Sequence, residues 1–270
     1  MTDYYNIITD IDPAIVENIA HVLEIRAADP AQRRMLEGYL GEIDFPPDSQ
    51  VLEIGCGTGA VARRLARWPG VAEVIGLDPS PVFVAKAQEL SAGHANLSFR
   101  QGSAHDLPFP EHSFDVVVFH TTLCHLSAPE NALAQAFRAL KPGGWLAVFD
   151  GDYASTTLGT GDLDPLQLCA ESFRAHFIDD SWIGRLTPKL ARHAGFTPVS
   201  YRSHGYTESA SPNYMLTIVD RGADALAHNQ QIGPELAAAL KAEARRRVAA
   251  HQFFGHISYT SLIARKAAAA

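Results

Sequence analysis

A run of glycines and two acidic residues form the clearest chemical pattern in the chain. The run is Gly55-Cys56-Gly57-Thr58-Gly59; Glu53 stands shortly before it, and Asp78 follows further along the chain. Glycines allow a tight backbone turn and let a ligand approach the main chain without meeting a Cβ atom. A carboxylate in the position of Asp78 can accept hydrogen bonds from both hydroxyls of a ribose. The pattern therefore indicates a site for a cofactor that contains an adenosyl group.

The elements that must position these residues are a strand, a turn and a helix. Residues 51–54 are a short apolar run that predicts a buried strand, and residues 60–68 predict the helix after the glycines. Residues 74–77 predict a second strand, which leads into Asp78. Asp78 alone could cap the helix predicted at 81–90. Its place at the carboxyl end of a strand, beside the switch point of the sheet, favours a ligand contact.

Strands and helices continue to alternate along the rest of the chain. We predict further strands at 97–101, 114–120, 145–150, 199–206 and 253–264, and further helices at 13–28, 30–41, 129–140, 165–178, 188–193, 213–228 and 234–251. This alternation predicts an α/β fold: a Rossmann-like, seven-stranded, doubly wound sheet with N-terminal helices and a helical insertion near the C-terminus, in which the strands up to residue 150 are parallel. The predicted domains are an N-terminal helical lid at 1–47, a Rossmann-like core at 48–206, a helical insert or lid at 207–252, and the last core strand with a tail at 253–270.

The glycines alone do not identify the cofactor. Gly55, Gly57 and Ala60 can be aligned with the fingerprint of dinucleotide-binding enzymes, which tolerates alanine at its last position. An NAD(P)-dependent oxidoreductase with a Rossmann fold is therefore the alternative hypothesis.

Five ordered segments, over about residues 48–150, resemble those of one enzyme family. Residues 53–59 resemble motif I of the class I S-adenosylmethionine-dependent methyltransferases, and residues 77–80 are similar to their ribose-binding motif. Residues 101–109 resemble the family's adenine segment, 114–117 its fourth strand and 140–144 the turn before its fifth. The branch resembled is that of small-molecule enzymes similar to those of ubiquinone and menaquinone biosynthesis. The resemblance implies S-adenosylmethionine as cofactor and in-line methyl transfer to oxygen, nitrogen or carbon of a small organic molecule.

The resemblance also implies a set of cofactor-binding residues. These are Glu53, Gly55, Cys56, Gly57, Gly59, Asp78, Pro79, Ser103, Ala104 and His120. The chain departs from the family at Ser103, where many relatives have an acid that accepts from the adenine amino group. The Ser103 hydroxyl, Asp106 or the backbone N–H of Ala104 could make that contact instead.

The acceptor side of the site is less well defined by the sequence. His125 is the candidate general base, with packing or helix capping as the other interpretation of this residue. A base is needed only where the acceptor starts protonated. The residues we expect at the substrate are Tyr4, Tyr5, His125, Asp152 and Tyr153.

Composition and the remaining motifs exclude other partners. The chain has 22 basic and 30 acidic residues and a net charge of -8, which disfavours nucleic acid as substrate. The segment that starts at His120 lacks the Asp/Asn-Pro-Pro-aromatic pattern of enzymes that methylate amino groups of nucleic-acid bases. Asp150 and Asp152 follow the fifth strand, but no acid ends the fourth, so we expect no metal.

Three widely spaced cysteines, and no signal peptide or membrane span, predict a cytoplasmic protein. The sequence is compatible with a homodimer.

Overall fold

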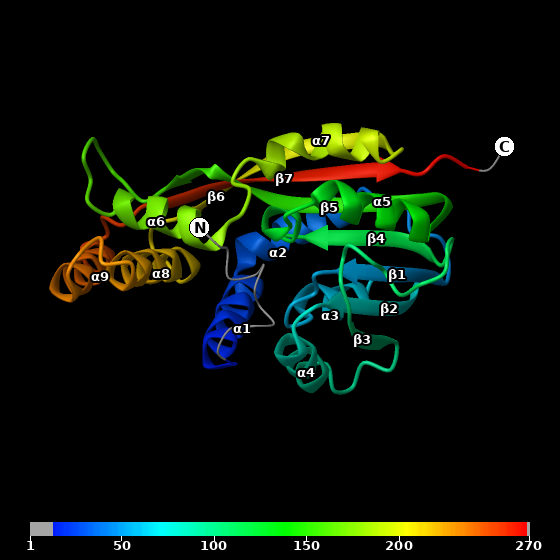
Figure 1. Ribbon diagram of the computed structural model, residues 1–270, viewed down its shortest axis with the longest axis horizontal. Coiled ribbons are helices and arrows are strands. Elements are labelled where there is room, and N and C mark those ends of the chain that lie inside the picture. The colour runs from blue at the N-terminus through cyan, green and yellow to red at the C-terminus, as the bar shows by residue number, and fades with distance from the viewer. Residues whose placement is uncertain (1–12, 269–270) are drawn as a thin grey trace.

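The computed structural model describes residues 13–268, so Tyr4 and Tyr5 lie outside the described residues. Its centre is a seven-stranded sheet in the order β3-β2-β1-β4-β5-β7-β6 (Figure 1). The strands are β1 (Ser49–Ile54), β2 (Val71–Asp78), β3 (Leu97–Gln101), β4 (Phe114–His120), β5 (Leu140–Thr157), β6 (Thr197–Glu208) and β7 (Gly255–Arg265). This sheet confirms the predicted Rossmann-like α/β fold.

Some helices flank the sheet, and others pack together at one end of the molecule. They are α1 (Pro13–Ala28), α2 (Pro30–Leu40), α3 (Ala60–Leu65), α4 (Pro81–Leu90), α5 (Pro129–Ala139), α6 (Gln167–Phe177), α7 (Ile183–His193), α8 (Tyr214–His228) and α9 (Pro234–Ala249). Helices α3 and α4 pack against β1, β2 and β3, whereas α5 and α7 contact each other and β5. Helices α6, α8 and α9 pack together at the far end of the molecule (Figure 1).

The central strand β4 explains why the core forms where it does. Val116, Val117, Val118 and Phe119 are fully buried, so both faces of this strand are covered. A strand in that position loses the alternation of polar and apolar residues that a one-sided sheet shows. The unbroken apolar run in the sequence is the local sign of this central place.

The sheet is mixed, because one strand runs against its neighbours. Strands β1 to β5 run parallel, but β7 is antiparallel to both β5 and β6. The reason lies in the connection: α8 and α9 lie at the end of the sheet where β6 stops, so the chain re-enters the sheet from that end. Glu208 fixes the start of α8 because its carboxylate accepts hydrogen bonds from the backbone N–H groups of Asn213, Tyr214 and Met215.

Among the predicted elements, β5 and α7 differ most from their predicted bounds. Strand β5 runs well past the predicted 145–150, because it continues to pair with β7 beyond Phe149, its last partner of β4. Helix α7 begins at Ile183 rather than 188, and Pro188 lies inside it. Proline lacks the N–H that would bond the Gly184 carbonyl. That carbonyl instead accepts from the hydroxyls of Tyr201 (2.9 Å) and Thr260 (3.2 Å), so the helix continues.

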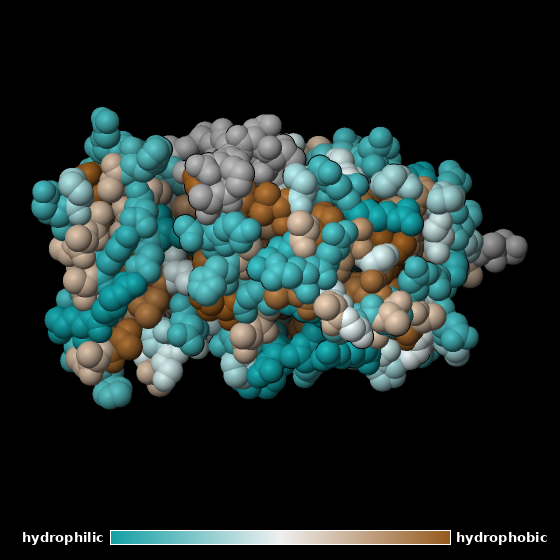
Figure 2. Space-filling view, turned by 90° about the horizontal axis from the view of Figure 1, so that it is seen from below, coloured by the Kyte–Doolittle hydropathy of each residue, from teal (hydrophilic) through white to brown (hydrophobic). Residues whose placement is uncertain are grey.

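Among residues 13–268, no helix is both long enough and apolar enough to cross a membrane. Seen from below, the surface is mostly hydrophilic, with hydrophobic side chains showing only in small areas (Figure 2).

Candidate cofactor and acceptor site

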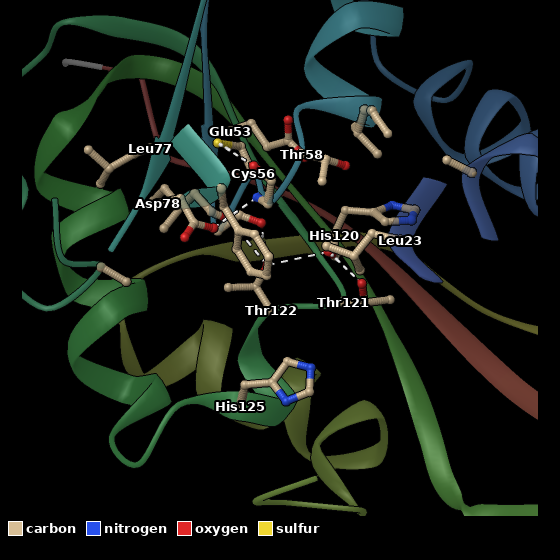
Figure 3. A pocket seen from close by; sticks show the side chains of 18 of the residues that line it. Leu23, Glu53, Cys56, Thr58, Leu77, Asp78, His120, Thr121, Thr122 and His125 are labelled. Atoms are coloured by element: carbon tan, nitrogen blue, oxygen red, sulfur yellow. Dashed lines mark hydrogen bonds between the residues drawn. The ribbon is translucent and has the colours of Figure 1, made fainter. Parts of the chain in front are cut away.

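A pocket opens where β1, β2 and β4 end. It encloses about 250 Å³ and is lined by the glycine loop, the ends of β2 and β4, the segment after β3, and residues of α1 and α2. Figure 3 shows Asp78 and His120 on opposite sides of this pocket, with Cys56 and Thr58 of the glycine loop between them. The carboxyl ends of neighbouring parallel strands thus bring the separate motifs to one cavity.

The glycine loop has the backbone that only glycine adopts readily. Gly55 and Gly57 have φ angles of 72° and 51°, and both line the pocket. Gly59, predicted to contact the cofactor, lies behind the lining instead. Its φ is 75°, and a Cβ there would stand 2.5 Å from the Phe99 ring, so Gly59 serves the start of α3 and its packing.

Asp78 shapes the loop as well as facing the pocket. One carboxylate oxygen accepts from the Gly57 backbone N–H at 2.8 Å, and the other accepts from the Ser80 N–H at 2.9 Å. Burial raises the pKa of Asp78 to about 6, against the lowering effect of these two N–H donors. Each oxygen keeps a lone pair for a further donor in the pocket.

Glu53 is a buried acid with an unused oxygen. Its side chain is 2% exposed, it lines the pocket, and its Oε2 has no hydrogen-bond partner among the described residues. Burial raises the pKa of Glu53 well above its usual value; the Ala62 N–H lowers it, and the nearby Asp78 raises it further. An unpartnered buried oxygen is costly, so the site is built for a donor or cation that supplies the missing bond.

His120 closes the side of the pocket formed by β4. Its Nδ1 shares a hydrogen bond of 2.9 Å with the Tyr39 hydroxyl, and its ring stacks on Phe149 with centroids 4.7 Å apart. Burial, and next the charge of Arg26, lower the pKa of His120 well below its usual value. The ring is therefore neutral at physiological pH and held in one orientation.

Only part of the segment predicted to bind adenine lines the pocket. Ser103 and Ala104 line the pocket, as does Pro79 at the end of β2. The Ser103 hydroxyl accepts from the His105 backbone N–H at 3.1 Å, and its own proton stays available for donation. Asp106 is exposed and does not line the pocket.

His125 follows β4 on a short 3-10 turn, Leu123–His125, and lines the pocket apart from the glycine loop (Figure 3). The fully buried Asp150 holds this turn in place through hydrogen bonds. One Asp150 oxygen accepts from the Cys124 backbone N–H at 3.2 Å, and the other accepts from the Gly151 N–H at 2.9 Å. Burial raises the pKa of Asp150.

Two predicted substrate residues lie away from the pocket. Asp152 forms an ion pair with Arg185 at 2.8 Å, and Tyr153 is 2% exposed and packs near Phe173. Both belong to the extended β5 strand and not to a loop over the site. The sequence predicts an end of this strand at 150, whereas the structure continues it through both residues.

The pocket also contains residues that the sequence did not single out. Most come from the leader helices, and others follow β2 and β3: Leu23, Arg26, Ala27, Gln32, Arg33, Leu36, Phe83 and His105. The Arg26 guanidinium donates to the Thr121 hydroxyl at 2.7 Å, which ties α1 to the segment after β4. No local signal marks these residues, because amphipathic helices carry similar side chains wherever they pack.

Within residues 13–268, no group of three or more His, Cys, Asp or Glu side chains is arranged to hold a metal ion.

Comparisons with known proteins agree with this geometry. Residues 52–148 match the family model described as a methyltransferase domain. A demethylmenaquinone methyltransferase from Tropheryma whipplei is 39% identical over 152 residues, which are 56% of this chain and 55% of that protein. An uncharacterised methyltransferase from Schizosaccharomyces pombe is 36% identical over 114 residues, 39% of this chain and 41% of that one. These relatives give the oxidoreductase alternative no support.

Solved structures share the fold over most of the chain. A candidate methyltransferase from Bacillus halodurans superposes with a TM-score of 0.61 at 19% identity, covering 86% of this chain and 98% of that one. A phosphoethanolamine N-methyltransferase from Haemonchus contortus, solved with S-adenosylhomocysteine, gives a TM-score of 0.54 at 19% identity, covering 87% of this chain and 53% of that one.

The chain spans about half the length of the curated relatives it matches, for example 54% of an uncharacterised protein from a Streptomyces fradiae transposon. Residues 52–148 match a methyltransferase domain, and the comparisons support a class I S-adenosylmethionine-dependent methyltransferase with S-adenosylmethionine as its cofactor.

Proposed function

We propose that this protein transfers the methyl group of S-adenosylmethionine to oxygen, nitrogen or carbon of a small organic molecule. The observation that carries the proposal is the pair of buried acids, Glu53 and Asp78, at the ends of adjacent strands in one pocket. Asp78 retains acceptor capacity for the two ribose hydroxyls. Glu53 has an oxygen without a partner, which fits the ammonium group of the methionine end.

The remaining cofactor contacts follow from the lining. Gly55, Cys56 and Gly57 bound the methionine end, and His120 faces it from β4. Ser103 and Ala104 take the adenine end, with the Ser103 hydroxyl as donor and the Ala104 segment packed below it. When bound, S-adenosylmethionine supplies a methyl group on a positively charged sulfur, which the lone pair of an acceptor displaces in line.

The protein's part in such a reaction is alignment and exclusion of water. Leu23 and Leu36 from the leader helices close the pocket on its outer side, and Thr121 and Thr122 bound it below His120. We assign the general base to His125 for acceptors that start protonated, since this side chain lines the pocket away from the cofactor residues. Asp150 holds the turn that carries it.

We also propose roles for the outer segments. Residues 1–47 act as a lid and residues 207–252 as a helical insert beside it, because α1 lines the pocket and also contacts α8. Three buried free cysteines support a cytoplasmic location.

Calorimetry with S-adenosylhomocysteine tests the proposal. We expect micromolar binding and a higher melting temperature on addition of the ligand, and tighter binding than that of NADH. Transfer of labelled methyl from S-adenosylmethionine to members of a broad acceptor panel would then define the activity. The absence of binding heat and of thermal stabilisation at millimolar cofactor would refute it.

A further inference from the structure

A second cleft adjoins the cofactor pocket between the leader helices and α3. It encloses about 640 Å³ and shares Ala27, Arg33, Ala60 and Arg64 with the first pocket, so the two cavities adjoin at these residues. The remaining lining residues are Glu24, Ala28, Glu37, Arg63, Arg67 and Trp68.

The charges of this cleft do not balance. Arg63 pairs with Glu24 at 2.8 Å, and Arg64 pairs with Glu37 at 3.0 Å. These two pairs use both acids of the lining. Arg33 and Arg67 also line the cleft, and the described part of the chain provides no acid for either.

Of the two unpaired arginines, Arg33 is the better candidate for contact with an anion. Its side chain is half-buried, whereas its neighbour Arg34 is exposed and lines neither cavity. A helix can keep an arginine in solvent at no cost, as α2 does with Arg34. A partly buried arginine that lines both cavities and has no acid partner can donate charge-assisted hydrogen bonds to an anion in either cavity.

Gln32, next to Arg33, gives a second, independent sign of a polar ligand. It is 4% exposed and lines the cofactor pocket; the Tyr259 hydroxyl lies nearby, but neither the amide nitrogen nor the amide oxygen of Gln32 makes a hydrogen bond of normal geometry among the described residues. Buried side-chain amides almost always have partners. The wall formed by the first turn of α2 thus offers an unused cation and an unused amide side by side.

We propose that the acceptor carries an acidic group, a carboxylate or phosphate, which Arg33 binds at the junction of the two cavities, with Arg67 adding charge further out. This rests on the proposed methyl transfer and names its substrate class. The reactive atom of the acceptor then lies in the inner pocket near His120, and its acidic end lies toward the cleft. Gln32 contacts the polar part between them.

Calorimetry on protein saturated with S-adenosylhomocysteine tests the anion site, with inorganic pyrophosphate as the probe. We expect binding to the wild type, at least tenfold weaker binding to Arg33→Gln, and a change within twofold for Arg34→Gln. The two variants lose the same charge from adjacent positions of one helix, so the difference isolates the cleft. No binding to the wild type, or equal weakening in both variants, would overturn the anion site.

The same variants distinguish the acceptor's acid from the carboxylate of the cofactor. Arg33→Gln should leave the affinity for S-adenosylhomocysteine within twofold. Weaker binding of S-adenosylhomocysteine, with unchanged binding of 5′-methylthioadenosine, would assign Arg33 to the methionine carboxylate and overturn the proposal. Failure of the wild type to bind S-adenosylhomocysteine would instead refute the methyltransferase function, so the two failures are distinguishable.

Small aromatic acids and their methyl esters identify the source of the anion. We expect acids to bind the loaded wild type, and to bind Arg33→Gln at least tenfold more weakly, whereas the neutral esters bind equally weakly to both. Pyrophosphate binding without binding of any acid would assign the cleft to a free phosphate compound and contradict the acceptor assignment.

Discussion

Glu53 and Asp78 bring two carboxyl groups into one buried site, and each raises the cost of ionising the other. Burial is the main cause of both raised pKa values, and the charge of Asp78 adds to that of Glu53. A cofactor with an ammonium group and a sulfonium relieves this repulsion, which a neutral nucleoside would not do. The two acids therefore have separable roles: Glu53 faces the positive charge of the cofactor, and Asp78 faces its ribose.

Substitution of Glu53 tests its role toward the ammonium group. Glu53→Gln keeps the shape of the side chain but removes the charge, so we expect at least tenfold weaker binding of S-adenosylhomocysteine, about 1.4 kcal/mol or more. Binding of 5′-methylthioadenosine, which lacks the amino acid end, should change less than twofold. Calorimetry measures both, with the exposed Glu130→Gln as control. Equal weakening of the two ligands would mean that Glu53 only supports the fold of the loop.

The pH dependence of binding reports on Asp78. Its pKa of about 6 means that the carboxyl takes up a proton as the pH falls through 6, and a protonated acid accepts ribose hydroxyls poorly. Because the ligand binds the ionised form, affinity should be constant above about pH 7 and fall about tenfold per unit well below 6. Titration with 5′-methylthioadenosine from pH 8 to 5 isolates this effect from Glu53. A flat profile would contradict it.

The raised pKa of Asp78 makes folding stability change with pH in the direction opposite to ligand affinity. A group that binds its proton more tightly in the folded protein contributes stability below its unfolded pKa, and that contribution is lost as the pH rises through 6. The empty protein thus carries an ionised, buried Asp78 at neutral pH. Binding of the cofactor offsets this cost, so ligand stabilisation should be large at pH 7.5.

At the scale of elements, the leader helices are attached to the glycine loop by polar contacts. The Glu24 carboxylate accepts from the Thr58 hydroxyl at 2.5 Å and from the Arg63 guanidinium at 2.8 Å. Arg26 reaches Thr121, whose φ of 54° is unusual for a β-branched residue. Helix α1 thus contacts both the glycine loop and the segment after β4.

Hydrogen exchange tests whether the leader helices close on the cofactor. We expect the amides of α1 and α2 to exchange at least tenfold more slowly when S-adenosylhomocysteine is bound, because the ligand joins the helices to the loop. In Glu24→Gln this protection should shrink, since one charged contact with α3 is lost, whereas Glu17→Gln, exposed on the same helix, should behave like the wild type. Equal exchange with and without ligand would mean that the helices are a fixed wall.

At the scale of the whole molecule, the structure joins the Rossmann-like sheet to a group of three helices, α6, α8 and α9, at one end. Helices α6 and α8 pack so closely that a Cβ on Gly222 would stand 2.0 Å from the Cys169 carbonyl oxygen. Arg247 of α9 pairs with Asp164 at 2.6 Å before α6, which ties the third helix to the group. These contacts lie away from the residues that line the cofactor pocket.

Gly222→Ala should therefore lower stability without altering the cofactor site. An alanine normally favours a helix, but here overpacking against backbone should cost about 1–3 kcal/mol. Urea unfolding measures the loss, and calorimetry should give an unchanged affinity for S-adenosylhomocysteine in the folded variant. Gly161→Ala is the control, since a Cβ at Gly161 meets nothing within 4 Å. A variant as stable as the wild type would refute the tight packing.

The sequence by itself determined the features that depend on neighbours along the chain. The apolar run before Gly55, the glycines themselves and the acid after the second strand identify the cofactor motif, since strand, turn and helix follow one another within it. Local patterns also located most helices, such as α4, where Ser80 caps the first turn by accepting from the Phe83 N–H. These signals need no knowledge of distant residues.

Only the tertiary structure decided which distant residues share the pocket and which leave it. Asp152 and Tyr153 left it because β5 extends to pair with β7, a partner more than a hundred residues away. Arg33 and Gln32 entered it because α2 packs beside the glycine loop. Such contacts depend on the relative positions of packed elements, which hydrophobic periodicity along one element does not specify. The glycine loop could therefore be predicted from its residues, whereas the wall that faces the acceptor could not.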